Sequence, residues 1–92
     1  MSTYVFDIDG TLVTQDGSNY PTAKPIKAAI DKLNDLYDDG HRIILMTARG
    51  STSGIDHSEF TQKQMNDFGI KHHELIMNKK PAGDFYIDDK AL

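Results

Sequence analysis

The chain has 92 residues, with 14 acidic and 10 basic side chains and a formal net charge of −4 at pH 7. This length fits a single domain, residues 1–92, and the lack of cysteine excludes disulfides and thiolate metal sites. The negative charge argues against a broad nucleic-acid surface, and no stretch has the roughly 20 apolar residues of a membrane span. We therefore expect a cytoplasmic protein with neither nucleic acid nor membrane as a partner.

The first expected strand, Thr3–Asp7, ends in a pair of aspartates, Asp7 and Asp9, which Gly10 and Thr11 follow. Because side chains alternate along a strand, the two aspartates should project to the same side at its end. Carboxylates this close repel each other, and burying either one without a partner is costly. The pair therefore predicts a cation at this site.

Helices and further strands alternate along the rest of the chain, which predicts a parallel α/β sheet with right-handed crossovers. The first helix should contain Pro25 in its first turn and end before Gly40. The second should run from an N-cap at Ser58 to Phe68, with Gly69 closing it. The remaining strands are expected at Arg42–Thr47, Glu74–Met77 and 85–88.

Two irregular loops, 10–22 and 48–57, follow the carboxyl ends of expected strands. Open α/β sheets bind ligands at this edge, so both loops are candidates for a functional role. Tyr20 in the first loop and His57 in the second are candidates for substrate contact.

In a parallel sheet, four groups of residues would converge on this edge: Asp7, Asp9 and Thr11; Thr47, Ala48 and Arg49; Lys79 and Lys80; and Asp88 and Asp89. Aspartates without histidine or cysteine form an oxygen-only site, which suits Mg²⁺ rather than Zn²⁺. A lysine, a hydroxyl group and loop N–H groups would offset the charge of a phosphoryl group. The set predicts phosphoryl transfer, in which Asp7 attacks phosphorus and Asp9 protonates the leaving oxygen and then activates water.

These residues resemble the haloacid dehalogenase (HAD) superfamily of Mg²⁺-dependent phosphatases. The matching pieces occur in the family's order: the run Asp7-Ile8-Asp9-Gly10-Thr11, the strand ending in Thr47, a downstream lysine, and Asp88-Asp89. The resemblance implies a compact Rossmann-like core without a cap domain, with about four parallel strands in the order 3-2-1-4 and flanking helices. In that order residues 78–84 must cross two strands, so we expect them to be extended.

The resemblance also implies a role for each matching aspartate. Asp7 would be the nucleophile and a metal ligand. Asp9 would be the general acid/base and would bind the metal through its main-chain carbonyl, and an aspartate here is typical of phosphatases. Asp88 would supply the carboxylate ligand to the metal. Asp89 would not bind the metal itself but would act next to the residues that do.

Thr47 and a lysine would bind the phosphoryl group. Lys80 directly precedes Pro81, as in small members of the family, and is favoured over Lys79. Arg49 fits either a substrate contact or a structural ion pair. The residues expected to bind substrate or phosphate are Thr11, Ala48 and Arg49.

The expected substrate is a small phosphorylated metabolite, such as a sugar or polyol phosphate, with a neighbouring subunit of a homo-oligomer as the lid. The strings at 47–50 and 86–91 resemble small phosphatases of bacterial surface-polysaccharide (capsule) gene clusters. Alternatives are a nucleotide or nucleic-acid-end phosphatase, a catalytically inactive binding module, and a receiver-like phosphoacceptor domain. In receivers the acidic pair ends the first strand and the phosphoacceptor lies mid-chain, which is the reverse of the order here.

Overall fold

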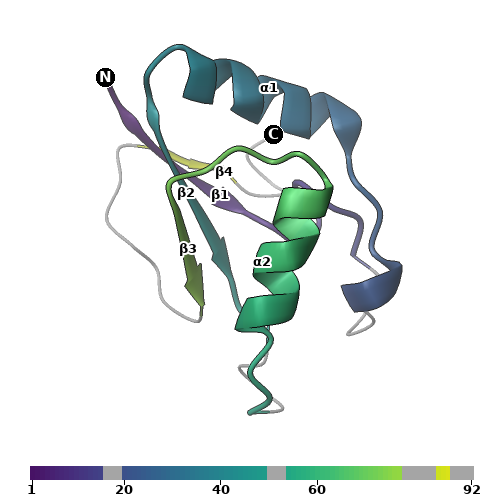
Figure 1. The fold of residues 1–92 in the computed structure, drawn as a ribbon. Helices are drawn as coiled ribbons and strands as arrows, with labels where there is room; N and C mark the ends of the chain where they lie inside the picture. Colours follow the sequence, from purple (N-terminus) through teal and green to yellow (C-terminus); the bar gives the residue numbers. More distant parts are fainter. Residues whose placement is uncertain (16–19, 50–53, 78–84, 88–92) are drawn as a thin grey trace.

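The computed structural model describes residues 1–15, 20–49, 54–77 and 85–87. These residues form a parallel sheet with the strand order β3-β2-β1-β4, which confirms the predicted α/β topology (Figure 1). The strands are β1 (Thr3–Asp7), β2 (Arg42–Thr47), β3 (Glu74–Met77) and β4 (Phe85–Ile87). The helices are the 3₁₀ helix η1 (Tyr20–Thr22) and the α-helices α1 (Lys27–Asp38) and α2 (Ser58–Asp67).

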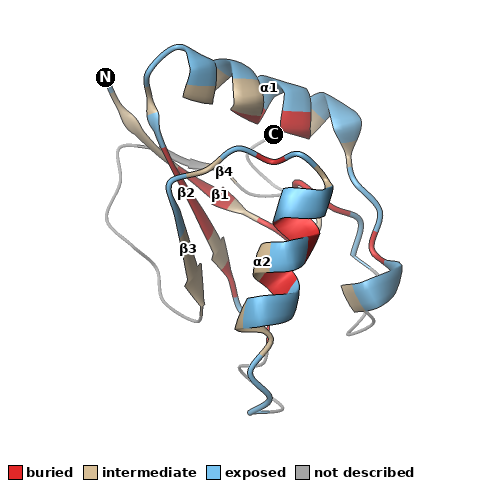
Figure 2. Cartoon of the chain, viewed as in Figure 1, coloured by how far each residue is buried: buried red, intermediate tan, exposed pale blue. Residues whose placement is uncertain are grey.

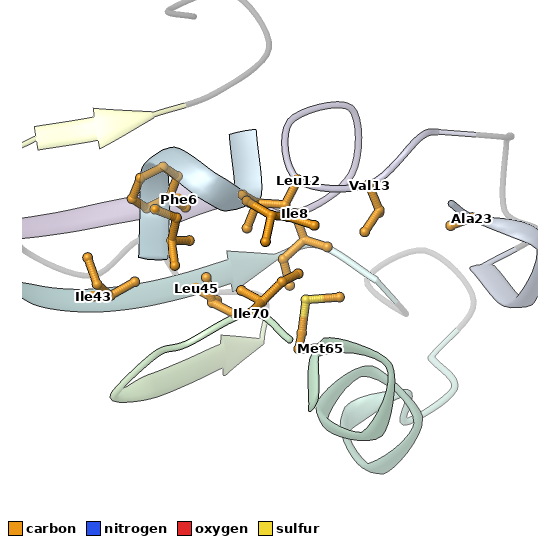
Figure 3. Packing of buried hydrophobic residues seen from close by; sticks show 11 residues of the cluster. Phe6, Ile8, Leu12, Val13, Ala23, Ile43, Leu45, Met65 and Ile70 are labelled. Carbon is orange, nitrogen blue, oxygen red and sulfur yellow. The ribbon is translucent and has the colours of Figure 1, made fainter. Parts of the chain in front are cut away.

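Both α-helices pack on the same face of the sheet. The register pairs Phe6 of β1 with Leu45 of β2, and both join one buried cluster with Leu33 of α1 and Met65 of α2. Figure 2 shows the buried residues along the two central strands and the inner side of α2, and Figure 3 shows Met65 pointing from α2 toward the strands. The carboxyl ends of β1 and β2 lie side by side at one edge of this core.

The segment after β1 winds into a tight turn. Gly10 adopts a φ of +83°, which favours glycine. The carbonyl of Ile8 accepts hydrogen bonds from the N–H groups of Thr11, Leu12 and Val13 at 3.2, 2.9 and 3.1 Å. Leu12 and Val13 are buried in the core as a result. The winding fixes the aspartate–glycine–threonine motif at the end of β1.

Hydrogen bonds also join the two arms of the loop that follows. The N–H of Thr14 donates to the carbonyl of Lys24 at 2.8 Å, and the N–H of Lys24 donates to Thr14 Oγ1 at 2.9 Å. The N–H of Ile26 donates to the carbonyl of Leu12 at 2.8 Å. The segment that leads into α1 is therefore hydrogen-bonded to the turn that follows β1.

The starts of both α-helices differ from the prediction. Pro25 lies before α1 in an isolated bridge with Val13, and α1 begins at Lys27. Ser58 is the first residue of α2 and His57 is its N-cap. The carboxylate of Asp56 accepts a hydrogen bond from the N–H of Ser58 at 2.9 Å. Hydrogen bonding to Ser58 lowers the pKa of Asp56 from its ordinary value.

The ends of both α-helices agree with the prediction, since glycines follow them with positive φ, +93° at Gly40 and +70° at Gly69. After α1, the N–H of Gly40 donates to the carbonyl of Tyr37 and the N–H of His41 to that of Leu36, both at 3.1 Å. This is the Schellman arrangement, which satisfies the last carbonyls of the helix.

Among the described residues, no helix is long and apolar enough to cross a membrane. Residues 78–84, which we expected to be extended, lie outside the described residues. The fourth strand is described as far as Ile87, and Asp88, the last residue of the predicted strand, also lies outside them.

We expect Gly40→Ala to lower the free energy of unfolding by about 1 kcal/mol, because the positive φ strains a residue with a Cβ atom. The space around Gly40 is open, so the loss comes from the backbone conformation and not from a clash. Urea denaturation measures the loss. Gly40→Asn is the control and should cost less, since asparagine tolerates this conformation; equal stability of all three proteins would contradict the prediction.

Candidate active site

The carboxyl end of β1 carries the two predicted catalytic aspartates. Asp7 is the last residue of the strand, and its Oδ1 accepts a hydrogen bond from the N–H of Ile8 at 2.9 Å. Asp9 lies in the turn that follows, where it forms an isolated bridge with Val13. Both residues are partly buried, so their carboxylates lie at the border between core and solvent.

Asp9 forms an ion pair with Arg49, which lies just after β2. Arg49 Nη2 donates to Asp9 Oδ1 at 2.8 Å, and Nε lies 3.2 and 3.1 Å from Oδ1 and Oδ2. The side chain of Arg49 is 0% exposed and that of Asp9 is 17% exposed. A buried guanidinium group is costly unless it is paired, so Asp9 compensates the charge of Arg49.

The rest of the Arg49 side chain is held by α2 and η1. Its Nη1 donates to Gln64 Oε1 at 2.8 Å and to Thr61 Oγ1 at 3.3 Å, and both residues belong to α2. Its Cζ lies 4.5 Å from the centre of the Tyr20 ring, a cation–π contact. Gln64 Nε2 in turn donates to the carbonyl of Tyr20 at 2.8 Å. Arg49 therefore connects both loops of this edge to α2.

Thr47 completes the contacts of Asp9. It is the last residue of β2 and is buried. Its Oγ1 donates to Asp9 Oδ2 at 3.3 Å and accepts a hydrogen bond from the N–H of Arg49 at 3.1 Å. Three of the predicted site residues, Asp9, Thr47 and Arg49, are thus in direct contact.

Thr11 is 2% exposed, and its Oγ1 is a buried side-chain atom without a hydrogen-bond partner in the described part of the chain. Leaving a buried hydroxyl unpaired costs roughly 1–3 kcal/mol. Such an atom in a motif expected to bind phosphate is a candidate contact for an anionic ligand.

The other predicted residues are distributed as follows. Ala48 is exposed between Thr47 and Arg49. No group of three or more potential metal-ligating side chains occurs within residues 1–15, 20–49, 54–77 and 85–87. The predicted residues that lie outside these ranges are Lys79, Lys80, Asp88 and Asp89.

The sequence did not point to Thr61 and Gln64 as part of this site. Polar residues on a helix are usually read as its solvent face, whereas these two are buried three residues apart and face Arg49. Met65, an apolar residue next to Gln64 and four residues after Thr61, is part of the core. Its position on the helix is the signal that could have shown that this face is buried. Tyr20 and His57, the candidates for substrate contact, meet edge to face with ring centres 5.1 Å apart.

A family model described as haloacid dehalogenase-like hydrolase matches residues 4–76. A crystal structure of a protein from Vibrio cholerae is similar, with a TM-score of 0.79 and 25% identity over 100% of this chain and 83% of that one. A conserved protein from Bacteroides thetaiotaomicron has a TM-score of 0.72 and 25% identity over 97% and 76% of the two chains. A chain of the Pnkp1/Rnl/Hen1 complex, 20% identical, shares the fold with a TM-score of 0.68 over 87% of this chain and 30% of that one. None of the curated proteins compared with this sequence matches it.

We expect Asp9→Ala to lower the free energy of unfolding by about 3 kcal/mol, because it leaves the guanidinium group of Arg49 buried without its counter-charge. Adding Arg49→Met removes the unpaired charge, so the two changes should be coupled by at least about 1 kcal/mol. Urea denaturation of both single variants and the double variant measures this coupling. The same cycle with Asp7→Ala in place of Asp9→Ala is the control; equal coupling in both cycles would contradict the prediction.

Proposed function

Because this chain belongs to the haloacid dehalogenase-like hydrolases, we propose that it is a Mg²⁺-dependent phosphomonoester hydrolase with Asp7 as the nucleophile and Asp9 as the general acid/base. One observation carries the proposal: the carboxylate of Asp9, two residues after Asp7 at the end of β1, is held by Thr47 and Arg49. A carboxylate fixed in this way beside a second carboxylate is suited to proton transfer next to a nucleophile.

The proposed reaction has two steps. A carboxylate oxygen of Asp7 attacks the phosphorus atom of the substrate, the bond from phosphorus to the ester oxygen breaks, and that oxygen takes a proton from Asp9. Water then attacks the aspartyl phosphate and gives a proton to Asp9, while the bond between phosphorus and Asp7 breaks. Orthophosphate leaves, and both aspartates return to their starting states.

The chemistry of the donors fits Mg²⁺, which prefers oxygen ligands. The Asp7 carboxylate is one such donor. The resemblance to the family implies that the main-chain carbonyl of Asp9 would be a second donor. Asp88, outside the described residues, would be the third donor. When bound, the ion would offset the negative charge of the phosphoryl oxygens.

Neutral and positive donors would bind the phosphoryl group. The hydroxyl group of Thr11, the N–H of Ala48 and the ammonium group of Lys80 are assigned to this task. Thr47 would join them when substrate binds, by turning its single hydroxyl proton from Asp9 to a phosphoryl oxygen. The hydroxyl of Thr11 has no hydrogen-bond partner among the described residues, which supports its assignment because a phosphoryl oxygen would satisfy it. The burial of Arg49 favours the structural ion pair over direct contact with substrate.

For the substrate we propose a small phosphorylated metabolite, such as a sugar or polyol phosphate, with a neighbouring subunit as the lid. A chain with net charge −4 does not favour a polyanionic nucleic acid, which supports a small substrate. Tyr20 and His57, whose rings meet between the two loops, are the residues that we assign to substrate selection. A role in bacterial surface-polysaccharide synthesis would suit such a substrate.

The proposal predicts hydrolysis of p-nitrophenyl phosphate in the presence of Mg²⁺. Asp7→Asn should reduce turnover by at least about 10³-fold, because the amide cannot attack phosphorus. EDTA should abolish turnover and excess Mg²⁺ should restore it. Asp35→Asn, the same chemical change at an exposed position of α1, is the control and should retain full activity. The absence of Asp7-dependent turnover across a panel of phosphate monoesters would refute the proposed function.

The substrate proposal predicts a higher kcat/KM for sugar and polyol phosphates than for nucleotides in the same panel. If a neighbouring subunit forms the lid, the active protein should sediment as an oligomer in analytical ultracentrifugation. A fully active monomer would exclude the lid, and a preference for nucleotides would exclude the substrate class.

A further inference from the structure

We propose that Arg49 is a positioning residue, which holds the Asp9 carboxylate in the orientation required for proton transfer and links that orientation to α2 and η1. The inference rests on the proposed function, because it needs Asp9 to act as the general acid/base. It assigns to Arg49 a task that is neither substrate contact nor only stabilisation of the fold.

The first argument is the way in which Arg49 holds Asp9. Nη2 and Nε form a planar fork that contacts both carboxylate oxygens, at distances of 2.8 to 3.2 Å. Thr47 adds a third donor, 3.3 Å from Oδ2. A carboxylate that accepts hydrogen bonds from a bidentate fork and a hydroxyl group is fixed both in position and in the rotation of its plane.

The second argument is that Arg49 is itself immobilised. The remaining terminal nitrogen, Nη1, is held by Gln64 and Thr61, and the face of the guanidinium group packs on Tyr20. The orientation of Asp9 is therefore set by the position of α2 and η1. A lysine could not replace this arrangement, because its donors radiate from one nitrogen and cannot form a planar fork.

The third argument concerns what the ion pair contributes. Replacing a buried ion pair with apolar side chains of similar volume is often neutral or stabilising, so stability alone does not account for a buried arginine here. The side chain of Asp9 is 17% exposed to solvent, so a substrate could reach it. Proton transfer requires hydrogen-bond geometry, and a misplaced general base loses much of its effect.

The test uses Arg49→Lys and p-nitrophenyl phosphate with Mg²⁺, followed by rapid quenching. Nitrophenolate leaves without a proton, so formation of the aspartyl phosphate should persist in the variant, and Asp9 gives its proton to solvent instead of to the leaving group. Hydrolysis of that intermediate needs Asp9 to take a proton from water and should slow by about 10²-fold. We therefore expect a burst of nitrophenolate near one equivalent per chain, and covalent phosphate that hydroxylamine releases. Asp9→Asn should give the same pattern.

A second variant, Gln64→Met, leaves the Asp9–Arg49 pair in place and removes one anchor of Arg49. It should show the same accumulation with hydrolysis slowed by about tenfold, because Arg49 gains freedom to move. It also provides the test if circular dichroism shows that Arg49→Lys does not fold. Gln62→Met, the same change at a position of α2 that contacts Asn66 and His72, is the control and should behave like the original protein.

Each other outcome overturns the inference in a recognisable way. If the burst rate and the steady-state rate of nitrophenolate release both fall in Arg49→Lys and no covalent phosphate accumulates, Arg49 supports only the fold. If KM for p-nitrophenyl phosphate rises and kcat stays unchanged, Arg49 contacts the substrate directly. If the original protein shows no Asp7-dependent release of nitrophenolate, the proposed function fails and the inference fails with it.

Discussion

A guanidinium group without access to water must have a partner for its charge, and this requirement at Arg49 determines how the functional edge of the protein is built. An unpaired buried charge would cost several kcal/mol, a large share of the stability of a small domain. The partners come from three different segments: Asp9 after β1, Gln64 of α2 and the Tyr20 ring of η1. Segments that are distant in the sequence are thereby brought to one point next to Asp7.

The strands could be predicted closely from the sequence because each is a short apolar run followed by polar residues. β1, β2 and β3 have the predicted bounds. The helix starts could not be predicted as well, because tertiary and local contacts compete there. Pro25 suits a first turn but pairs with Val13 instead, and the N-cap of α2 is His57 rather than Ser58.

For the candidate site, the sequence pointed to residues with a specific motif or strand-end position, and it missed residues whose contacts depend on the fold. The spacing of Asp7 and Asp9 and the position of Thr47 at a strand end were enough to place them at one edge of the sheet. Gln64 has no such signal, because a glutamine on a helix becomes part of a site only when the fold buries it. Arg49 was left between two interpretations, and in the structure its buried side chain forms an ion pair with Asp9.

The two hydrogen bonds between Thr14 and Lys24 have a consequence for how the chain would tolerate insertions. Because these bonds join residues ten positions apart, they close a loop that is separate from the turn that carries Asp9. Doubling the length of such a closed loop costs only about 0.6 kcal/mol in chain entropy. Residues added inside this loop would therefore leave in place the hydrogen bonds that hold the turn after β1.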